Sequence, residues 1–268
     1  QSAENFHRGS LAFRYALALL YGRPMTDRPE LCDGCEKPWS ERHALSCPCG
    51  GLPTRRHDEL QGCLASLLRQ AGMLVTAHPT VREARMHAPV HRDDRGLVGD
   101  LRVRGLFNPQ IDAVLDVSFV DLDANCRVGG DPERKLAERA RSKRRQYHDA
   151  CRHNRQDFAP FVVSPDGCLE AAAEDILGRV VRRLAEKSEY ATAYIAGTVR
   201  ATVQLAIARA ASLCLRGPRR RDEAVGPRGQ GEKDDQAGER RREADCGRVP
   251  QLCDAGGVAA AGGPRESA

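Results

Sequence analysis

The 268-residue sequence lacks a run of apolar residues long enough to cross a membrane. The nearest candidate, Leu205–Leu215, is interrupted by Arg209 and falls short of the roughly 18 apolar residues that a spanning helix needs. No signal-peptide pattern follows Gln1. These absences argue against a membrane protein and a secreted one, so we expect an intracellular protein, nuclear or cytoplasmic. Because the first residue is not Met, we also expect a fragment of a longer polypeptide or an incomplete gene model.

Aromatic residues are scarce as well, at 4% of the chain, and the net charge is only +5. Residues 217–268 contain no aromatic residue, and their ten basic and ten acidic side chains cancel. This segment also holds ten Gly and four Pro, so it buries too little apolar surface to offset its ordering entropy. We therefore predict a disordered tail at 217–268; frame-shifted or non-coding sequence translated in error is the alternative. The charge excess then lies in residues 1–216 and is too small to identify a nucleic-acid partner by itself.

Cysteine is the residue type that the sequence does have in unusual number, with eleven in the chain. Three Cys and one His fall within a span of 16 residues inside 31–52, and Zn²⁺ prefers four such ligands in a tetrahedron. The segment has few apolar residues, so metal binding would supply its folding energy. We predict a structural zinc site, with Cys49 as a substitute for Cys47; free thiols or a redox pair are the alternative. The predicted ligands are Cys32, Cys35, His43 and Cys47.

Hydrophobic patterns predict an α/β fold in which residues 55–168 form a core with the order α-β-β-β-α-β. A helical segment is expected in 1–30, a polar loop at 80–97, and a helical pair in 169–216, where apolar residues recur at helical spacing. The predicted core elements are a helix at 58–71, strands at 73–77, 100–103 and 113–120, a helix from 131 to about 151, and a strand at 159–164.

Two acidic residues are expected on one face of the sheet. Successive strand residues point to opposite faces, so Asp116 and Ser118 lie opposite the apolar residues of their strand. If the strands at 100–103 and 113–120 form an antiparallel pair, Asp100 joins Asp116 on the face away from the core. Two close carboxylates repel each other, which favours binding of a divalent cation between them. A pair of solvated acids on the strand face is the alternative.

The helix that follows these strands is strongly basic, with nine Lys or Arg against three acids in 133–155. Four residues recur in it at four-residue spacing and so form one stripe. A basic stripe with an aromatic member suits a phosphate backbone, and an ordinary solvated helix face is the alternative. The members of the stripe are Lys135, Arg139, Lys143 and Tyr147.

Together these motifs resemble the zinc-knuckle and restriction-like endonuclease region of reverse-transcriptase polyproteins from retrotransposons without long terminal repeats. The resemblance is colinear over about residues 11–220. The residues that carry it are the Cys/His cluster, His43–Gly51, Arg56-His57-Asp58, Gly99-Asp100-Leu101, Leu115-Asp116-Val117, Lys143–Tyr147, Phe158–Ser164 and Cys214–Gly217.

The resemblance implies a PD-(D/E)xK nuclease core, a zinc knuckle and DNA as the partner, with element RNA as a second one. In that chemistry Asp100 and Asp116 hold Mg²⁺ and Lys143 assists hydrolysis. Tyr147, one turn further along the helix, is the fourth candidate catalytic residue. Glu59 is a candidate for an added carboxylate. The expected DNA contacts are Arg56, His57, Lys135, Arg139 and Arg144.

Two residues depart from the family pattern, since Gly99 replaces Pro before Asp100 and Ser118 stands where the simple pattern has Lys. No paired-Asp polymerase signature is present. The first expectation is an endonuclease module that nicks target DNA. The alternatives are a zinc-dependent nucleic-acid-binding module without catalysis and a decayed element fragment. The sequence gives no oligomeric state.

Overall fold

The computed structural model describes most of the first 216 residues. The described residues are 28–82, 96–122 and 131–216, together with Arg14, Tyr15, Leu17, Ala18, Leu19, Tyr21, Arg23, Met25 and Arg219. They belong to a single unit of the chain, Gln1–Arg221. The five described residues between 14 and 19 are helical. The rest of the predicted N-terminal segment up to 27, and the predicted tail apart from Arg219, lie outside the described residues.

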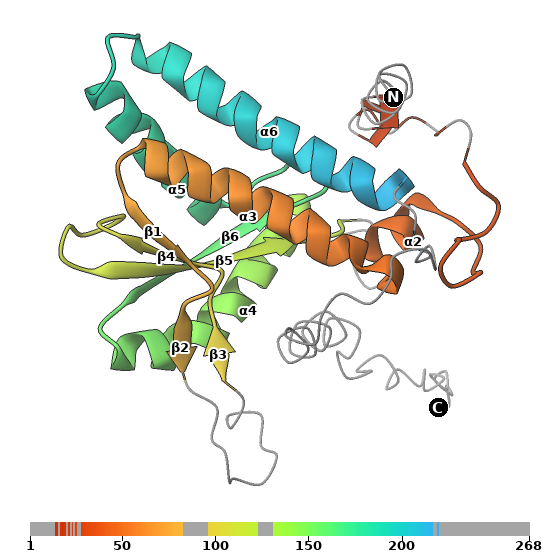
Figure 1. The fold of residues 1–268 in the computed structure, drawn as a ribbon, viewed down its shortest axis with the longest axis horizontal. Helices are drawn as coiled ribbons and strands as arrows, with labels where there is room; N and C mark the ends of the chain where they lie inside the picture. Colours follow the sequence, from red (N-terminus) through yellow and green to blue (C-terminus); the bar gives the residue numbers. More distant parts are fainter. Residues whose placement is uncertain are drawn as a thin grey trace, which may run out of the picture. The chain divides into compact units, whose positions relative to one another are not determined.

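The fold is mixed α/β, as the sequence predicts, and it is built around a four-stranded sheet (Figure 1). Neighbouring strands are antiparallel except for the last two, which are parallel and are connected through α4 (Pro132–His153). Helix α3 (Leu52–Gln70) precedes the first strand. In order across the sheet, the strands are β1 (Leu74–Ala77), β4 (Leu101–Arg104), β5 (Asp112–Phe119) and β6 (Asp157–Val163).

The segment predicted as a polar loop at 80–97 contains two short strands instead. Strand β2 (Thr80–Arg82) pairs with β3 (Leu97–Val98) in a separate two-stranded sheet. These strands are too short for alternation to appear in the sequence, but Val81 and Leu97 are buried against Tyr147 of α4. The remainder of the predicted loop, 83–95, lies outside the described residues.

Helices cover both faces of the four-stranded sheet. Figure 1 shows α3, α5 (Ala171–Glu186) and α6 (Thr192–Arg216) on one side and α4 on the other. The larger core lies under the three helices and includes Leu115 and Val117 of β5. Alternate residues of β5 point toward α4, which packs on the sheet through two smaller apolar clusters. The face that carries Asp116 is therefore a second packing face rather than a solvated one.

Local signals explain where the helices begin. The side chain of Asp131 accepts hydrogen bonds from the amides of Glu133 and Arg134, and so caps α4 as its sequence predicts. Helix α3 begins at Leu52, six residues before the predicted start, with Gly51 in the left-handed conformation and Pro53 in its first turn. Within the described part of the chain, no helix has both the length and the apolar character required to cross a membrane.

Candidate functional site

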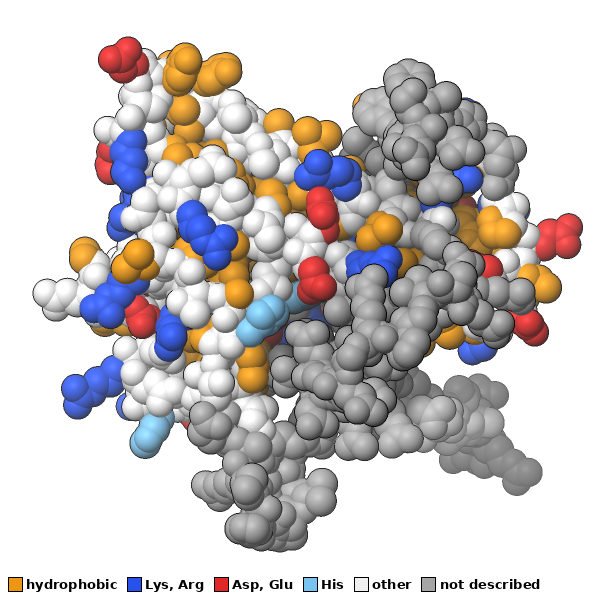
Figure 2. Space-filling model, viewed as in Figure 1, with side chains coloured by type: hydrophobic (Ala, Val, Ile, Leu, Met, Phe, Trp, Pro, Cys, Tyr) orange, Lys and Arg blue, Asp and Glu red, His pale blue; other side chains and the backbone are white. Residues whose placement is uncertain are grey.

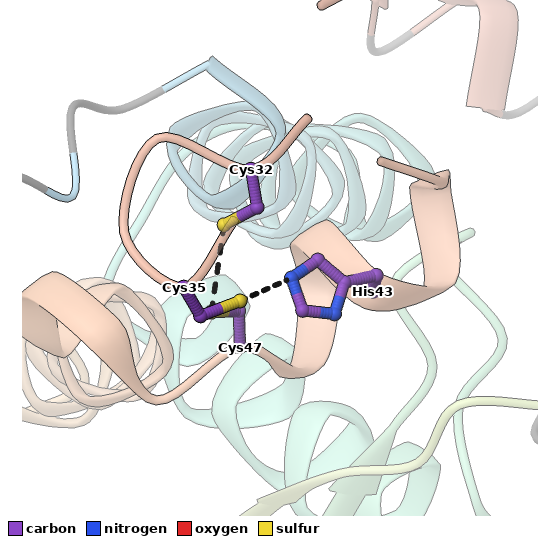
Figure 3. A group of neighbouring side chains, drawn as sticks. All are labelled: Cys32, Cys35, His43 and Cys47. Atoms are coloured by element: carbon purple, nitrogen blue, oxygen red, sulfur yellow. Dashed lines mark hydrogen bonds between the residues drawn. The ribbon is translucent and has the colours of Figure 1, made fainter. Parts of the chain in front are cut away.

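The four predicted zinc ligands lie together (Figure 3). Cys32 and Cys35 come from the loop before α2 (Glu41–Ser46), His43 comes from α2, and Cys47 follows its last residue. Their ligand atoms all lie within 4.8 Å of one another. This local structure is set by Ser40, whose side chain caps α2 by accepting a hydrogen bond from the amide of His43.

The spacing of the ligand atoms fits a zinc ion. Cys47 Sγ is 3.8 Å from the Sγ atoms of both Cys32 and Cys35, and Cys35 Sγ is 3.2 Å from His43 Nε2. Four ligands at about 2.3 Å around a tetrahedral ion would place sulfur atoms about 3.8 Å apart. Three sulfurs and one imidazole are also the donor set that Zn²⁺ prefers. The cluster is therefore a potential metal site consistent with structural zinc.

The thiols of the cluster differ in their pKa. Burial raises the pKa of Cys32, but hydrogen bonds from the amide of Gly34, from His43 and from Cys35 outweigh burial and lower the pKa to about 6. Burial raises the pKa of Cys47 to about 12, although a hydrogen bond from the amide of Cys49 acts in the opposite direction. The backbone of Cys49, and not its thiol, thus serves the cluster, and Cys49 is not among the four grouped ligands.

The loop that carries the Cys/His cluster also packs on the end of α6. Trp39 and Leu45 share an apolar cluster with Leu215 and other residues of α6, so the loop and the helix form a small common core. The guanidinium of Arg219 donates hydrogen bonds to the carbonyls of Ala44 and Cys214 and is 5% exposed. Arg219 belongs to the segment predicted as a tail, and it is instead buried against this loop.

The second site lies between the sheet and α4, where Asp100 and Asp116 meet. Leu101 pairs with Leu115, and this register brings Asp100 opposite Asp116 on the neighbouring chain segment. The two residues are 6% and 2% exposed, so they are not solvated acids. Asp100 Oδ2 accepts a hydrogen bond of 2.6 Å from the amide of Val117, which fixes its carboxylate against β5.

The positive charge of a lysine balances the negative charge of Asp116. Lys143 Nζ lies 3.0 Å from Oδ1 and 2.8 Å from Oδ2 of this carboxylate, and Ser118 donates a hydrogen bond of 3.2 Å to Oδ2. Burial raises the pKa of Asp116, but the charge and hydrogen bond of Lys143, the hydroxyl of Tyr147 and the charge of Arg139 lower it more. The carboxyl is thus held ionised, with a pKa below its ordinary value.

A histidine neutralises Asp100. His57 Nε2, from the first turns of α3, lies 3.0 Å from Asp100 Oδ2. Burial lowers the pKa of His57, but hydrogen bonds to Asp100 and Asp58 and the charges of Asp100 and Asp116 raise it to about 10. His57 is therefore an imidazolium at neutral pH, and it supplies charge rather than acting as a base.

We expect the His57–Asp100 pair to make stability depend on pH in the alkaline range. Because the folded-state pKa lies above the ordinary 6.5, the stabilisation is complete below pH 6.5 and is lost as pH rises toward 10. The test is urea unfolding of the parent and of His57→Gln at pH 6, 8 and 10. The difference in the free energy of unfolding between parent and variant should decrease with rising pH. A constant difference would contradict the ion pair.

Tyr147 supports the site from a fully buried position. Its ring stacks on Phe158 with a centroid separation of 4.6 Å, and its hydroxyl lies 2.8 Å from Asp116 Oδ1 and 2.7 Å from the carbonyl of Val98. It therefore connects β3 to β5, and so links the segment that leads into Asp100 with Asp116. Through these two contacts Tyr147 fixes the carboxylate of Asp116 relative to the backbone of Val98.

Tyr147→Phe is expected to lower the free energy of unfolding by about 1–3 kcal/mol, because a buried carbonyl and carboxylate lose a donor while the ring stacking remains. Chemical denaturation measures this loss. Tyr190→Phe is the matched control, since Tyr190 is 67% exposed. Equal stability of the two variants would show that the hydroxyl does not tie the strands together.

The other predicted site residues mostly face inward rather than toward solvent. Lys135 is buried and donates a hydrogen bond to the carbonyl of Leu122, Arg139 is half-buried, and the guanidinium of Arg56 bonds the carbonyl of Leu45 and stacks on Phe119. Of the five expected DNA contacts, Arg144 alone is exposed, 3.7 Å from Glu170. Glu59 pairs with Arg209 of α6. The stripe on α4 is thus its inner face.

Sequence reasoning assigned no role to two residues that support Asp100 and Asp116. Gln61 donates a hydrogen bond of 2.9 Å to the carbonyl of Asp100 and is 6% exposed. Its position four residues after His57, on the same face of α3, is the signal that could have found it. The sequence places Ser118 on the same strand face as Asp116 but assigns it no role, and in the structure its hydroxyl donates a hydrogen bond to Asp116.

Carboxylates are the ligand type that hard divalent cations prefer. Mg²⁺ keeps several water ligands and is usually bound through one or two carboxylates together with substrate phosphate. Asp100 and Asp116 offer such a pair, and their charges are balanced by His57 and Lys143. Among the described residues, the Cys/His cluster is the group of three or more candidate ligands that lie close enough to hold an ion.

Comparisons with known proteins give no family. No protein-family model matches the sequence, and a search of curated proteins finds no match. The site must therefore be interpreted from its own residues and from the motif resemblance described above.

Proposed function

We propose that this protein is a DNA endonuclease module that nicks target DNA by metal-dependent hydrolysis of a phosphodiester, as part of a retrotransposon reverse-transcriptase polyprotein. The observation that supports it most is the meeting of Asp100, Asp116 and Lys143 at one place from three separate segments. A PD-(D/E)xK core, a zinc knuckle that holds structural zinc, and Mg²⁺ as the catalytic ion belong to the same proposal.

Energetics favour a functional role for these charges over a structural one. A buried ion pair loses hydration that its own attraction barely repays, and apolar residues of similar volume often stabilise a fold as well. Here the Lys143–Asp116 and His57–Asp100 ion pairs are neighbours, because Asp100 and Asp116 lie opposite each other on adjacent strand segments. Their cations come from α4 and α3. Ionisable groups held in such a cluster, with shifted pKa values, are typical of sites that perform chemistry.

The proposed roles follow from the geometry of the chain. Asp100 and Asp116 would hold Mg²⁺, which lowers the pKa of a bound water and neutralises charge on the scissile phosphate. Lys143 has a flexible stem whose ammonium can turn from Asp116 to the phosphate and stabilise developing negative charge. Ser118 and Tyr147 orient the carboxylate of Asp116, and Gln61 holds the backbone of Asp100.

The test is nicking of supercoiled plasmid by the full chain with Mg²⁺ or Mn²⁺. Asp116→Asn should reduce nicking at least about 100-fold, because the carboxylate is replaced by a neutral amide of the same size. Glu189→Gln is the control, since this acid is exposed and lies between α5 and α6, and it should nick like the parent. Circular dichroism confirms that each variant is folded. Equal nicking by parent and Asp116→Asn would refute the assignment.

A second candidate is a zinc-dependent nucleic-acid-binding module without catalysis. Two features favour it: Ser118 occupies the place of the usual Lys, and each carboxylate already has a cation of the protein as its partner. This candidate predicts a folded, zinc-loaded parent that binds DNA with strong salt dependence and leaves the plasmid intact. A decayed fragment would show neither zinc nor binding.

A further inference from the structure

The outer face of α4 carries three exposed arginines, Arg141, Arg145 and Arg152. They recur at intervals of four and seven residues and so share one side of the helix. Arg141 and Arg145 each stand two residues from Lys143, about 200° around the helix from it. The side chains that reach Asp116 and those of this face therefore point in opposite directions.

Arg141, Arg145 and Arg152 differ from Arg134, Arg144 and His148 of the same helix in having no acidic side chain within 4 Å among the described residues. Arg134 lies 3.7 Å from Glu138, Arg144 lies 3.7 Å from Glu170, and His148 lies 2.8 Å from Asp149. Glu138, Glu170 and Asp149 are thus already paired with other cations. Figure 2 shows Lys and Arg dispersed over the face in view rather than gathered in one patch, so pairing is more informative than total charge.

We propose that Arg141, Arg145 and Arg152 form a second DNA contact, which binds the phosphate backbone of a duplex apart from the cleavage site. The set spans about 16 Å of helix, which corresponds to about five base pairs of duplex axis. Each guanidinium presents a fork of donors that matches a phosphate. A helix about 10 Å thick separates this face from Asp116, so a different stretch of DNA must occupy it.

The surroundings of the arginines favour nucleic acid over a membrane surface. A helix that lies on a membrane needs an exposed apolar face beside its basic one. The apolar residues of α4 are instead buried against the sheet: Leu136, Ala140, Tyr147 and Cys151. The proposal rests on the proposed function only in taking duplex DNA as the partner.

The experiment measures binding of a labelled 30-base-pair duplex by the full, zinc-loaded chain at several salt concentrations. No Mg²⁺ or Mn²⁺ is added, so binding is separated from cleavage, and no chelator is present. The test variant is Arg141→Gln/Arg145→Gln/Arg152→Gln. The control variant is Arg28→Gln/Arg69→Gln/Arg182→Gln, which removes the same charge from three exposed arginines elsewhere.

The test variant should bind more than about tenfold more weakly at 0.1 M salt, and its log–log salt slope should fall by about 1 per arginine. The control variant should keep most of the parent's affinity and most of its salt slope. An unchanged slope, an equal loss in the control, or equally arginine-dependent binding of polyglutamate would overturn the proposal. Failure of the parent to nick plasmid would refute the endonuclease and leave this result untouched, so the two failures are distinguishable.

Discussion

Replacing Cys47 by Ser is expected to abolish tight zinc binding. Cys47 Sγ lies 3.8 Å from two other sulfurs of the cluster, and its loss removes a direct ligand from a four-ligand site. Loss of a mere outer-shell partner weakens metal binding about 10- to 100-fold, so loss of a ligand should weaken it more than about 100-fold. The loop that ends at Gly51 should then lose order, since metal binding supplies much of its folding energy.

Zinc content after dialysis against a chromogenic chelator measures this effect, and protease sensitivity of the loop reports its order. Cys168→Ser is the matched control, because Cys168 is exposed and stands outside the cluster. The control should retain one zinc ion per chain. Retention of zinc by Cys47→Ser, or absence of zinc from the folded parent, would contradict a structural metal at this cluster.

The second large effect is expected from Lys143→Met. Methionine keeps the length of the side chain but leaves the Asp116 carboxylate buried without its cation. Breaking a buried ion pair in this way costs about 3–5 kcal/mol of stability at neutral pH. Arg145→Met, on the exposed face of the same helix, should change stability by less than about 1 kcal/mol. Urea unfolding compares both variants with the parent.

The cost should depend on pH in a direction set by the pKa of Asp116. In the parent this pKa lies below the ordinary 3.8, so the ionised carboxyl stabilises the fold above pH 3.8 and this contribution is lost as pH falls further. Without Lys143, burial dominates and raises the pKa above its ordinary value. The deficit of Lys143→Met should therefore shrink between pH 7 and pH 5. An equal deficit at both values would show that Asp116 is not the group left unpaired.

The sheet could be predicted from the sequence more closely than the orientation of the helix beside it. The strand expected at 113–120 is β5 at Asp112–Phe119, and the one at 100–103 is β4 at Leu101–Arg104. Alternation of apolar residues defined both, because each strand has one face in the larger core. The same alternation placed Asp100 and Asp116 on a common face.

The orientation of α4 could not be predicted because its inner face is itself polar. A basic helix is normally oriented by its apolar stripe, and Lys135 and Lys143 here lie on the buried side with it. Lys143 points inward because it pairs with the buried carboxylate of Asp116. That contact joins residues 27 positions apart in the sequence. Likewise, the burial of Arg219 depends on the carbonyls of Ala44 and Cys214, which no local pattern reveals.

The most direct test of the proposed hydrolytic site is the chemistry of the DNA ends that it would produce. Plasmid nicked by the parent with Mg²⁺ or Mn²⁺ is repurified and treated with DNA ligase. Hydrolysis that leaves a 3′-hydroxyl and a 5′-phosphate predicts resealed circles, and Asp116→Asn should give no nicked product to reseal. Nicks that ligase cannot close, or no nicking by a folded and zinc-loaded parent, would contradict metal-dependent hydrolysis at Asp100 and Asp116.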